Sequence, residues 1–185
     1  MKNLSLILSL FLFISHSFAA KKADVELPDN MNLAGKELVL NGIGIRRATI
    51  FNVKVYVGGL YVLKKSQDAN EIINAENPKH ITMKFVRSVD AEDLQDAWLE
   101  GFKAAVSEEN RKPMMEAFKK FNATMKDVEE GDSILINFLD QGVQVSVKGQ
   151  KHPFIGDKAF SKALLSIWFI NARDERLGDE LLGKE

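Results

Sequence analysis

Cysteine is absent from the 185-residue chain, and histidine, proline and tyrosine are scarce, with three, four and two residues. Without cysteine there are no disulfide bonds, so the hydrophobic core must hold the fold, and a cysteine nucleophile is excluded. The sequence also lacks a glycine-rich phosphate loop, an HExxH motif and a GxSxG motif. His80 and His152 lie far apart without helical spacing, so we expect neither a metal site nor a cofactor.

An excess of charge of either sign is missing as well. The chain has 25 lysines and arginines against 26 aspartates and glutamates, which gives a formal net charge of −1 at pH 7. This near-neutral balance gives no electrostatic reason to expect a nucleic-acid partner.

The longest apolar run lies at the N-terminus and has the pattern of a secretory signal peptide. Lys2 supplies the positive charge, residues 4–14 are apolar, and Ser17 and Ala19 are the small residues that a cleavage site needs. The run is too short to span a bilayer, which disfavours a membrane anchor. We therefore predict a signal peptide over residues 1–19, cleavage after Ala19, and a periplasmic or secreted protein of bacterial type. Residues 20–185 then form a single domain.

Residues 40–63 form the longest stretch with the composition of a β-sheet, rich in Val, Ile, Tyr and Phe. Alternation of apolar and polar residues predicts two long strands, 44–51 and 53–63, paired as a hairpin about Asn52. The Asn41-Gly42 pair predicts a turn just before them.

The rest of the chain mixes strands and helices. Residues 31–36 have the composition of a loop, and residues 171–185 form a charged tail with a last apolar pair, Leu181 and Leu182. Periodicity and capping residues predict further strands at 25–28, 38–40, 80–86, 133–139 and 143–147, and helices at 68–75, from Asp90, from Pro113 and at 158–170. This order indicates an α+β fold, with an antiparallel sheet covered by helices on one face.

Two adjacent arginines, Arg46 and Arg47, interrupt the apolar pattern of the long hairpin. Neighbouring residues in a strand point to opposite faces, and a charge facing an apolar sheet surface is costly unless it is paired. A guanidinium matches a carboxylate well, and Tyr56 or Tyr61 across the hairpin would add a hydroxyl donor. The alternative is a surface arginine whose stem covers the sheet while its charge stays in water.

These residues carry a resemblance to the chalcone isomerase fold family. The segments LNGIGIR at residues 40–46 and VKVYVGGLYV at residues 53–62 resemble the family pattern. Later segments also fit: FVR at 85–87, the helix with Trp98 and Gly101, DKAF at 157–160 and SIW at 166–168. The resemblance implies an open-faced β-sandwich, a large antiparallel sheet covered by a layer of helices, with a cleft between the layers.

The resemblance also implies a role for Arg46. In fatty-acid-binding members of the family an arginine binds the carboxylate, and it matches Arg46, so Arg47 is expected to point to solvent or to the opposite sheet face. The polar groups of the plant enzymes, in contrast, fall on Tyr56, near Leu94, near Gly101 and at Ser166-Ile167. Their loss implies that flavonoid chemistry is absent.

Three functions follow from these observations. The first is non-catalytic binding of a small amphipathic carboxylate such as a fatty acid, with six candidate ligand-binding residues: Arg46, Tyr56, Trp98, Phe102, Ser166 and Trp168. The second is an isomerase or intramolecular lyase on an unknown substrate, with Arg46 stabilising an oxyanion and Tyr56 as general acid. The third is a protein without a ligand that acts through its surface. Pairing of Arg46 with Glu100 or Asp96, and a solid interior, would favour this third function.

Overall fold

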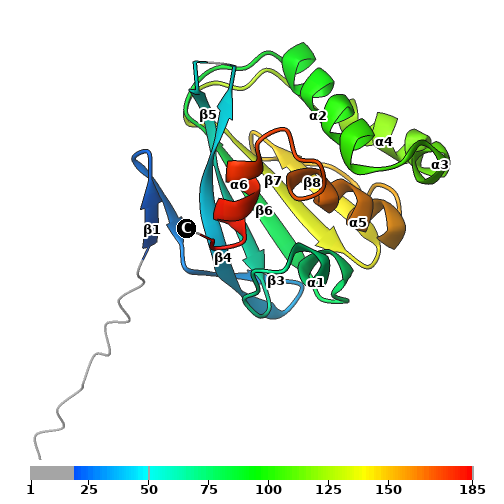
Figure 1. Cartoon of the computed structure of the whole chain (residues 1–185), viewed down its shortest axis with the longest axis horizontal. Helices are drawn as coiled ribbons and strands as arrows, with labels where there is room; N and C mark the ends of the chain where they lie inside the picture. Colours follow the sequence, from blue (N-terminus) through cyan, green and yellow to red (C-terminus); the bar gives the residue numbers. More distant parts are fainter. Residues whose placement is uncertain (1–18, 50, 185) are drawn as a thin grey trace, which may run out of the picture.

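The structure is a computed structural model that describes residues 19–49 and 51–184. A large antiparallel sheet dominates it, with helices packed over one face (Figure 1). The seven strands lie in their sequence order: β3 (Asn30–Leu33), β4 (Lys36–Ala48), β5 (Val53–Val62), β6 (Lys79–Phe85), β7 (Ser133–Leu139), β8 (Gly142–Val147) and β9 (Gln150–Lys151). This arrangement confirms the predicted α+β class and the open-faced sheet with its helix layer.

The helices occupy the connections between strands and the end of the chain. They are α1 (Ala69–Asn74), α2 (Ala91–Ala105), α3 (Glu108–Arg111), α4 (Met115–Asn122), α5 (Lys158–Leu165) and α6 (Glu175–Leu181), with 3₁₀ turns at Lys112–Met114 and Ser166–Trp168. Asp68 caps α1, because its side chain accepts hydrogen bonds from the backbone N–H groups of Asn70 and Glu71.

The main core lies between the helices and the sheet. Alternate residues of the central strands face it, and Ile81, Ile134 and Ile136 are completely buried there. From the helix layer, Phe102 of α2 stacks on Phe118 of α4 with ring centroids 4.6 Å apart. Helix α2 approaches Ile167 closely at Gly101, where a β-carbon would lie 2.7 Å from the Ile167 side chain. The absence of a side chain at this position therefore lets α2 pack closely against Ile167.

A two-stranded hairpin covers part of the opposite sheet face. It consists of β1 (Ala19–Lys22) and β2 (Val25–Pro28), and Leu27 packs against Ile45 and Val57 from this side. Alternation along β4 therefore places Ile43 and Ile45 under the hairpin, while Gly42, Gly44 and Arg46 face the helix layer.

The predicted hairpin of two long strands is confirmed, but the predicted turn at Asn41-Gly42 is wrong. Strand β4 continues through these residues, and its pairing with β5 shifts by one residue between Leu40 and Gly42. The Asn41 side chain donates to the carbonyls of Ser66 and Leu181 at 3.0 and 2.9 Å. The sequence pair typical of a turn therefore forms a β-bulge here, because a distant segment binds it.

Two further expectations are corrected by the structure. Residues 31–36 are not a loop throughout, because β3 pairs with the first residues of β4. The charged tail forms α6, which packs across β4 with Leu177 and Leu181 buried. The buried leucines of this segment are Leu177, Leu181 and Leu182. Three apolar residues among many charged ones give too weak a periodic signal to predict a helix.

The predicted signal peptide lies outside the described residues except for Ala19, the first residue of β1. None of the helices in the described part of the chain is long and apolar enough to cross a membrane.

Candidate functional site

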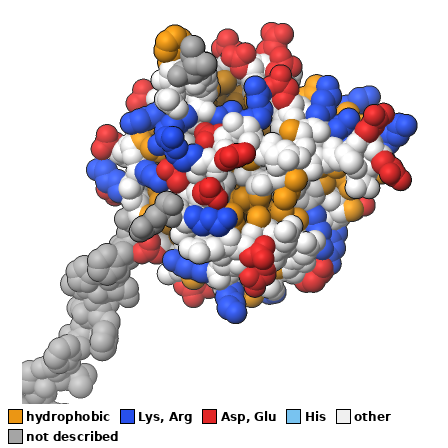
Figure 2. Space-filling view, in the orientation of Figure 1, with side chains coloured by type: hydrophobic (Ala, Val, Ile, Leu, Met, Phe, Trp, Pro, Cys, Tyr) orange, Lys and Arg blue, Asp and Glu red, His pale blue; other side chains and the backbone are white. Residues whose placement is uncertain are grey.

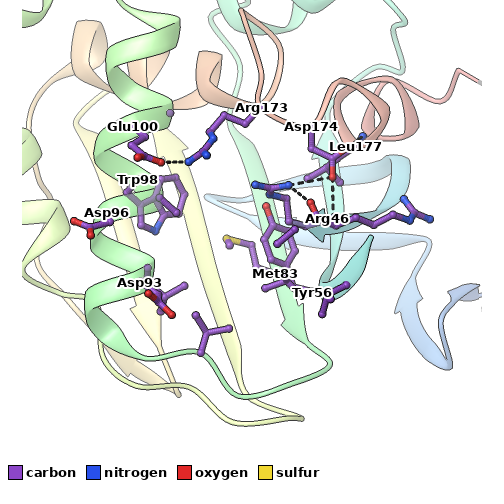
Figure 3. A pocket seen from close by; sticks show the side chains of 18 of the residues that line it. Arg46, Tyr56, Met83, Asp93, Asp96, Trp98, Glu100, Arg173, Asp174 and Leu177 are labelled. Atoms are coloured by element: carbon purple, nitrogen blue, oxygen red, sulfur yellow. Dashed lines mark hydrogen bonds and ion pairs between the residues drawn. The ribbon is translucent and has the colours of Figure 1, made fainter. Parts of the chain in front are cut away.

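A cleft of about 1050 Å³ lies between the β4–β5 hairpin, α2 and the segment that leads into α6. Its inner wall is mostly apolar and includes Val55, Met83, Leu94, Trp98, Ile167, Trp168 and Leu177. Figure 3 shows Trp98 on the α2 side and Arg46 and Tyr56 on the sheet side. The expected cleft between sheet and helices is therefore present, and the interior at this end is not solid.

Arg46 and Tyr56 lie opposite each other on β4 and β5, on the sheet face that looks toward the helices. Residues paired across two antiparallel strands share a face, so the guanidinium and the phenol are neighbours at the floor of the cleft (Figure 3). The structure thus brings together the arginine and the tyrosine that the sequence singled out.

Arg46 is paired within the protein. Its Nη1 lies 3.3 Å from Oδ2 of Asp174 and also donates to the carbonyl oxygen of Arg47. The partner is Asp174 rather than Glu100 or Asp96, and Glu100 pairs instead with Arg173. An internally paired Arg46 favours the third function, a protein without a ligand. The open cleft beside the pair favours a ligand-binding protein instead.

Asp174 has three partners at once. Its Oδ2 accepts from the backbone N–H of Arg47 at 2.8 Å, and its Oδ1 accepts from the N–H of Leu177 at 3.2 Å as the N-cap of α6. One carboxylate therefore caps the helix, binds the exposed edge of β4 and neutralises Arg46. No local sequence pattern marks Asp174, because it stands in the charged tail and only the fold brings it to the hairpin.

Tyr56 is held by one hydrogen bond. Its hydroxyl oxygen accepts from Nε1 of Trp168 at 3.2 Å, and the residue is 7% exposed. Burial raises the pKa of Tyr56 to about 12, against a smaller lowering by the Trp168 hydrogen bond and by Arg46. The phenol is therefore protonated at neutral pH. Its own proton has no acceptor among residues 19–49 and 51–184, which leaves it free to donate into the cleft.

The other four candidate residues divide into two groups. Trp98 and Trp168 line the cleft and pack edge to face, with centroids 5.3 Å apart. Phe102 and Ser166 are not among the residues that line it. Phe102 is fully buried against Phe118, and the Ser166 hydroxyl donates to the carbonyl of Ala163 at 2.7 Å, as helix-terminal serines often do.

The Arg47 side chain contacts the edge of β4 and α6. It also lines the cleft, with Nη1 3.0 Å from the Ile45 carbonyl and 3.8 Å from Glu180. The pairing of β4 with β5 shifts again between Arg46 and Arg47, and the extra residue at this irregularity, Val55, lies on β5.

Charge on the cleft wall is balanced rather than basic. Four arginines (Arg46, Arg47, Arg87 and Arg173) and five acidic residues (Asp90, Asp93, Asp96, Glu100 and Asp174) line it. Basic and acidic side chains also alternate over the face shown in Figure 2. Within the described ranges, no group of three or more His, Cys, Asp or Glu residues is placed to hold a metal ion.

An open antiparallel sheet, a helix layer on one face and a cleft between them that contains an arginine and a tyrosine define the class of this protein as a chalcone isomerase-type fold. The chalcone isomerase-like family model matches residues 19–183, and the chain belongs to this family. The expected family membership is thereby confirmed.

The fold is similar to that of a solved plant protein. A crystal structure of the fatty-acid binding protein AtFAP1 from Arabidopsis thaliana matches with a TM-score of 0.66 and 13% sequence identity, over 91% of this chain and 97% of that one. At this identity the match establishes the fold alone. A search of curated proteins finds no match.

Proposed function

We propose that this chain binds a small amphipathic carboxylate, such as a fatty acid, without catalysing a reaction on it. The observation that carries the proposal is the pair of donors, Arg46 and Tyr56, at the polar end of a cleft whose inner wall is apolar. Apolar pockets with few, well-placed polar groups are typical ligand sites. The fatty-acid binding function of the similar Arabidopsis protein supports this choice of ligand.

Arg46 and Tyr56 both have hydrogen-bond donor groups that a ligand could use. Arg46 uses only Nη1 for its contacts with Asp174 and Arg47, so Nε and Nη2 have no partner among the residues described. The hydroxyl proton of Tyr56 likewise has no acceptor among the residues described. A carboxylate could accept from both side chains, and its alkyl chain would lie along Trp98 and Leu94.

Catalysis is not part of this proposal because the cleft lacks a proton-transfer group where the plant enzymes have theirs. Leu94 and Gly101 line the wall at those positions. Neither can donate or accept a proton through its side chain, so the proton-transfer groups that the family resemblance places at these two positions are missing.

Mass spectrometry of lipids released from the purified protein tests the proposal. The wild type should release single-chain carboxylic acids, and Arg46→Ala should release far less, because it removes the anchoring donor and leaves Asp174 unpaired. Arg176→Ala is the matched control, since Arg176 is exposed on α6 and outside the cleft wall. Equal lipid content in wild type and Arg46→Ala, or no lipid in either, would contradict the proposal.

One observation favours a second candidate function, isomerisation. The Tyr56 phenol stays protonated at neutral pH and lies beside Arg46, an arrangement suited to a general acid next to an oxyanion. Turnover of a chalcone that exceeds background and falls in Tyr56→Phe would support this candidate. A rate equal to background would contradict its simplest form.

We also propose export to the periplasm or beyond the cell, on the basis of the signal-like pattern of residues 1–19. Cell fractionation followed by mass measurement should find a mature chain that begins at Ala20. An intact chain confined to the cytoplasm would contradict export.

A further inference from the structure

We infer that Asp174 determines head-group selectivity in the cleft by competing with the ligand for Arg46. This inference rests on the proposed function and deepens it, because it concerns which polar head groups the same site accepts. In wild-type protein, an uncharged head such as an alcohol should bind about as well as a carboxylate of equal chain length.

The positive charge of Arg46 is already compensated within the protein. The Arg46 and Asp174 side chains are only 22% and 12% exposed, and they lie 3.3 Å apart. An ion pair that is largely removed from water is screened little by solvent or salt. A ligand carboxylate that approaches Arg46 therefore meets a guanidinium whose charge is already compensated.

The other charged residues of the cleft wall supply no net positive charge. Arg87 is exposed and makes no ion pair within the described ranges, but the same holds for Asp90 beside it. Arg47 faces Glu180 at 3.8 Å, and Arg173 pairs with Glu100. On the opposite wall, Asp93 and Asp96 of α2 are exposed and make no ion pair within the described ranges. Figure 3 shows them on the α2 side of the same pocket. An anionic head thus gains little net attraction, while repulsion from Asp174 opposes it.

Asp174 cannot simply move away when a ligand arrives. Its two oxygens also hold the N–H groups of Arg47 and Leu177, at 2.8 and 3.2 Å. Displacing it would leave the edge of β4 and the first turn of α6 without their acceptor. The counter-ion is therefore fixed in place, and a neutral head can accept from Tyr56 and from Nε or Nη2 of Arg46 without displacing it.

Calorimetric titration with decanoate and 1-decanol at about pH 8, where a carboxyl group is ionised, tests the inference. Wild-type protein should bind the two ligands within about threefold of each other. Asp174→Asn should bind decanoate about tenfold more tightly than wild type, because Arg46 then lacks a counter-ion. Its affinity for decanol should change by less than about twofold. Asp179→Asn is the matched control on the same helix, since Asp179 pairs with Lys184 outside the cleft.

A wild type that prefers decanoate by more than about threefold would overturn the inference, as would an Asp174→Asn variant with an unchanged preference. Because an asparagine has one acceptor oxygen and Asp174 holds two backbone N–H groups, this variant could fail to fold. The wild-type comparison decides the question in that case, since it needs no substitution. Failure of every protein to bind either ligand would contradict the proposed function itself, and the inference with it.

Discussion

Tyr56 shows at the scale of one residue how burial sets chemistry in the cleft. The phenol is packed under Trp168, which donates to its oxygen at 3.2 Å, and its pKa rises to about 12 because the phenolate would be desolvated. The hydroxyl is therefore protonated at neutral pH and held in orientation by the indole.

The raised pKa makes a prediction about alkaline stability. Between pH 10.0, where an ordinary tyrosine ionises, and about 12, the unfolded chain releases the Tyr56 proton while the folded chain keeps it. Stability is thus fully present below pH 10 and is lost as pH rises toward 12, by on the order of 2–3 kcal/mol from this residue. Urea unfolding at a series of pH values should show a shallower loss in Tyr56→Phe than in the wild type.

At neutral pH the same variant should be less stable than the wild type by about 1–3 kcal/mol, because the Trp168 N–H loses its acceptor in a buried place. Tyr61, whose pKa burial also raises to about 12, is present in both proteins, so its contribution cancels in the comparison. Parallel stability curves for wild type and Tyr56→Phe above pH 10 would show that Tyr56 ionises freely in the folded state.

At the scale of elements, the important feature is the exposed edge of β4. Beyond β3, the backbone of this edge binds side chains instead of another strand. The Ile43 carbonyl accepts from Lys22 at 3.1 Å, and the Ile45 N–H donates to Glu180 at 2.8 Å. Asp174 holds the N–H of Arg47 in the same way. The β1–β2 hairpin and α6 therefore satisfy an edge that would otherwise invite pairing with another chain.

Gly42 lets α6 dock on this strand, and its substitution should be costly. A β-carbon at Gly42 would lie 2.2 Å from the Glu180 carbonyl oxygen and 2.5 Å from that of Leu181, both backbone atoms that cannot swing aside. Gly42→Ala should lower the free energy of unfolding by roughly 1–3 kcal/mol, measured by urea denaturation.

Gly58→Ala on the neighbouring strand is the matched control. A β-carbon there would meet its nearest atom, on the Tyr56 ring, at 3.4 Å, an ordinary contact. Its stability should stay within about 0.5 kcal/mol of the wild type. Equal changes in the free energy of unfolding for Gly42→Ala and Gly58→Ala would show that α6 does not pack tightly against β4 at Gly42.

At the scale of the whole molecule, the sequence predicted the antiparallel sheet and its helix layer. It did not predict α6, which packs on β4 at the end of the chain. Alternation and helical periodicity are local signals, so the long hairpin, β6, α2 and the β7–β8 hairpin could be found. Arg46, Tyr56, Trp98 and Trp168 were also found, and they line the cleft. No local pattern, in contrast, marks the change of register between β4 and β5 that follows Arg46.

Asp174 and α6 depend on contacts between residues more than 120 positions apart, such as Asp174 with Arg46 and Glu180 with Ile45. Such contacts leave no periodic trace in a single sequence. Phe102 and Ser166 differ from the other four candidates in their position. Both stand on the correct helices but lie outside the cleft wall, because a residue's facing depends on packing that sequence spacing does not determine.

A crystal structure of the protein with decanoate tests the central claim most directly, because it locates the ligand relative to the two donors. We predict a carboxylate within hydrogen-bond distance of Arg46 and Tyr56, with the alkyl chain between Trp98 and the sheet and the Arg46–Asp174 pair retained. A ligand bound on the outer sheet face, or with its carboxylate away from Arg46, would contradict the account.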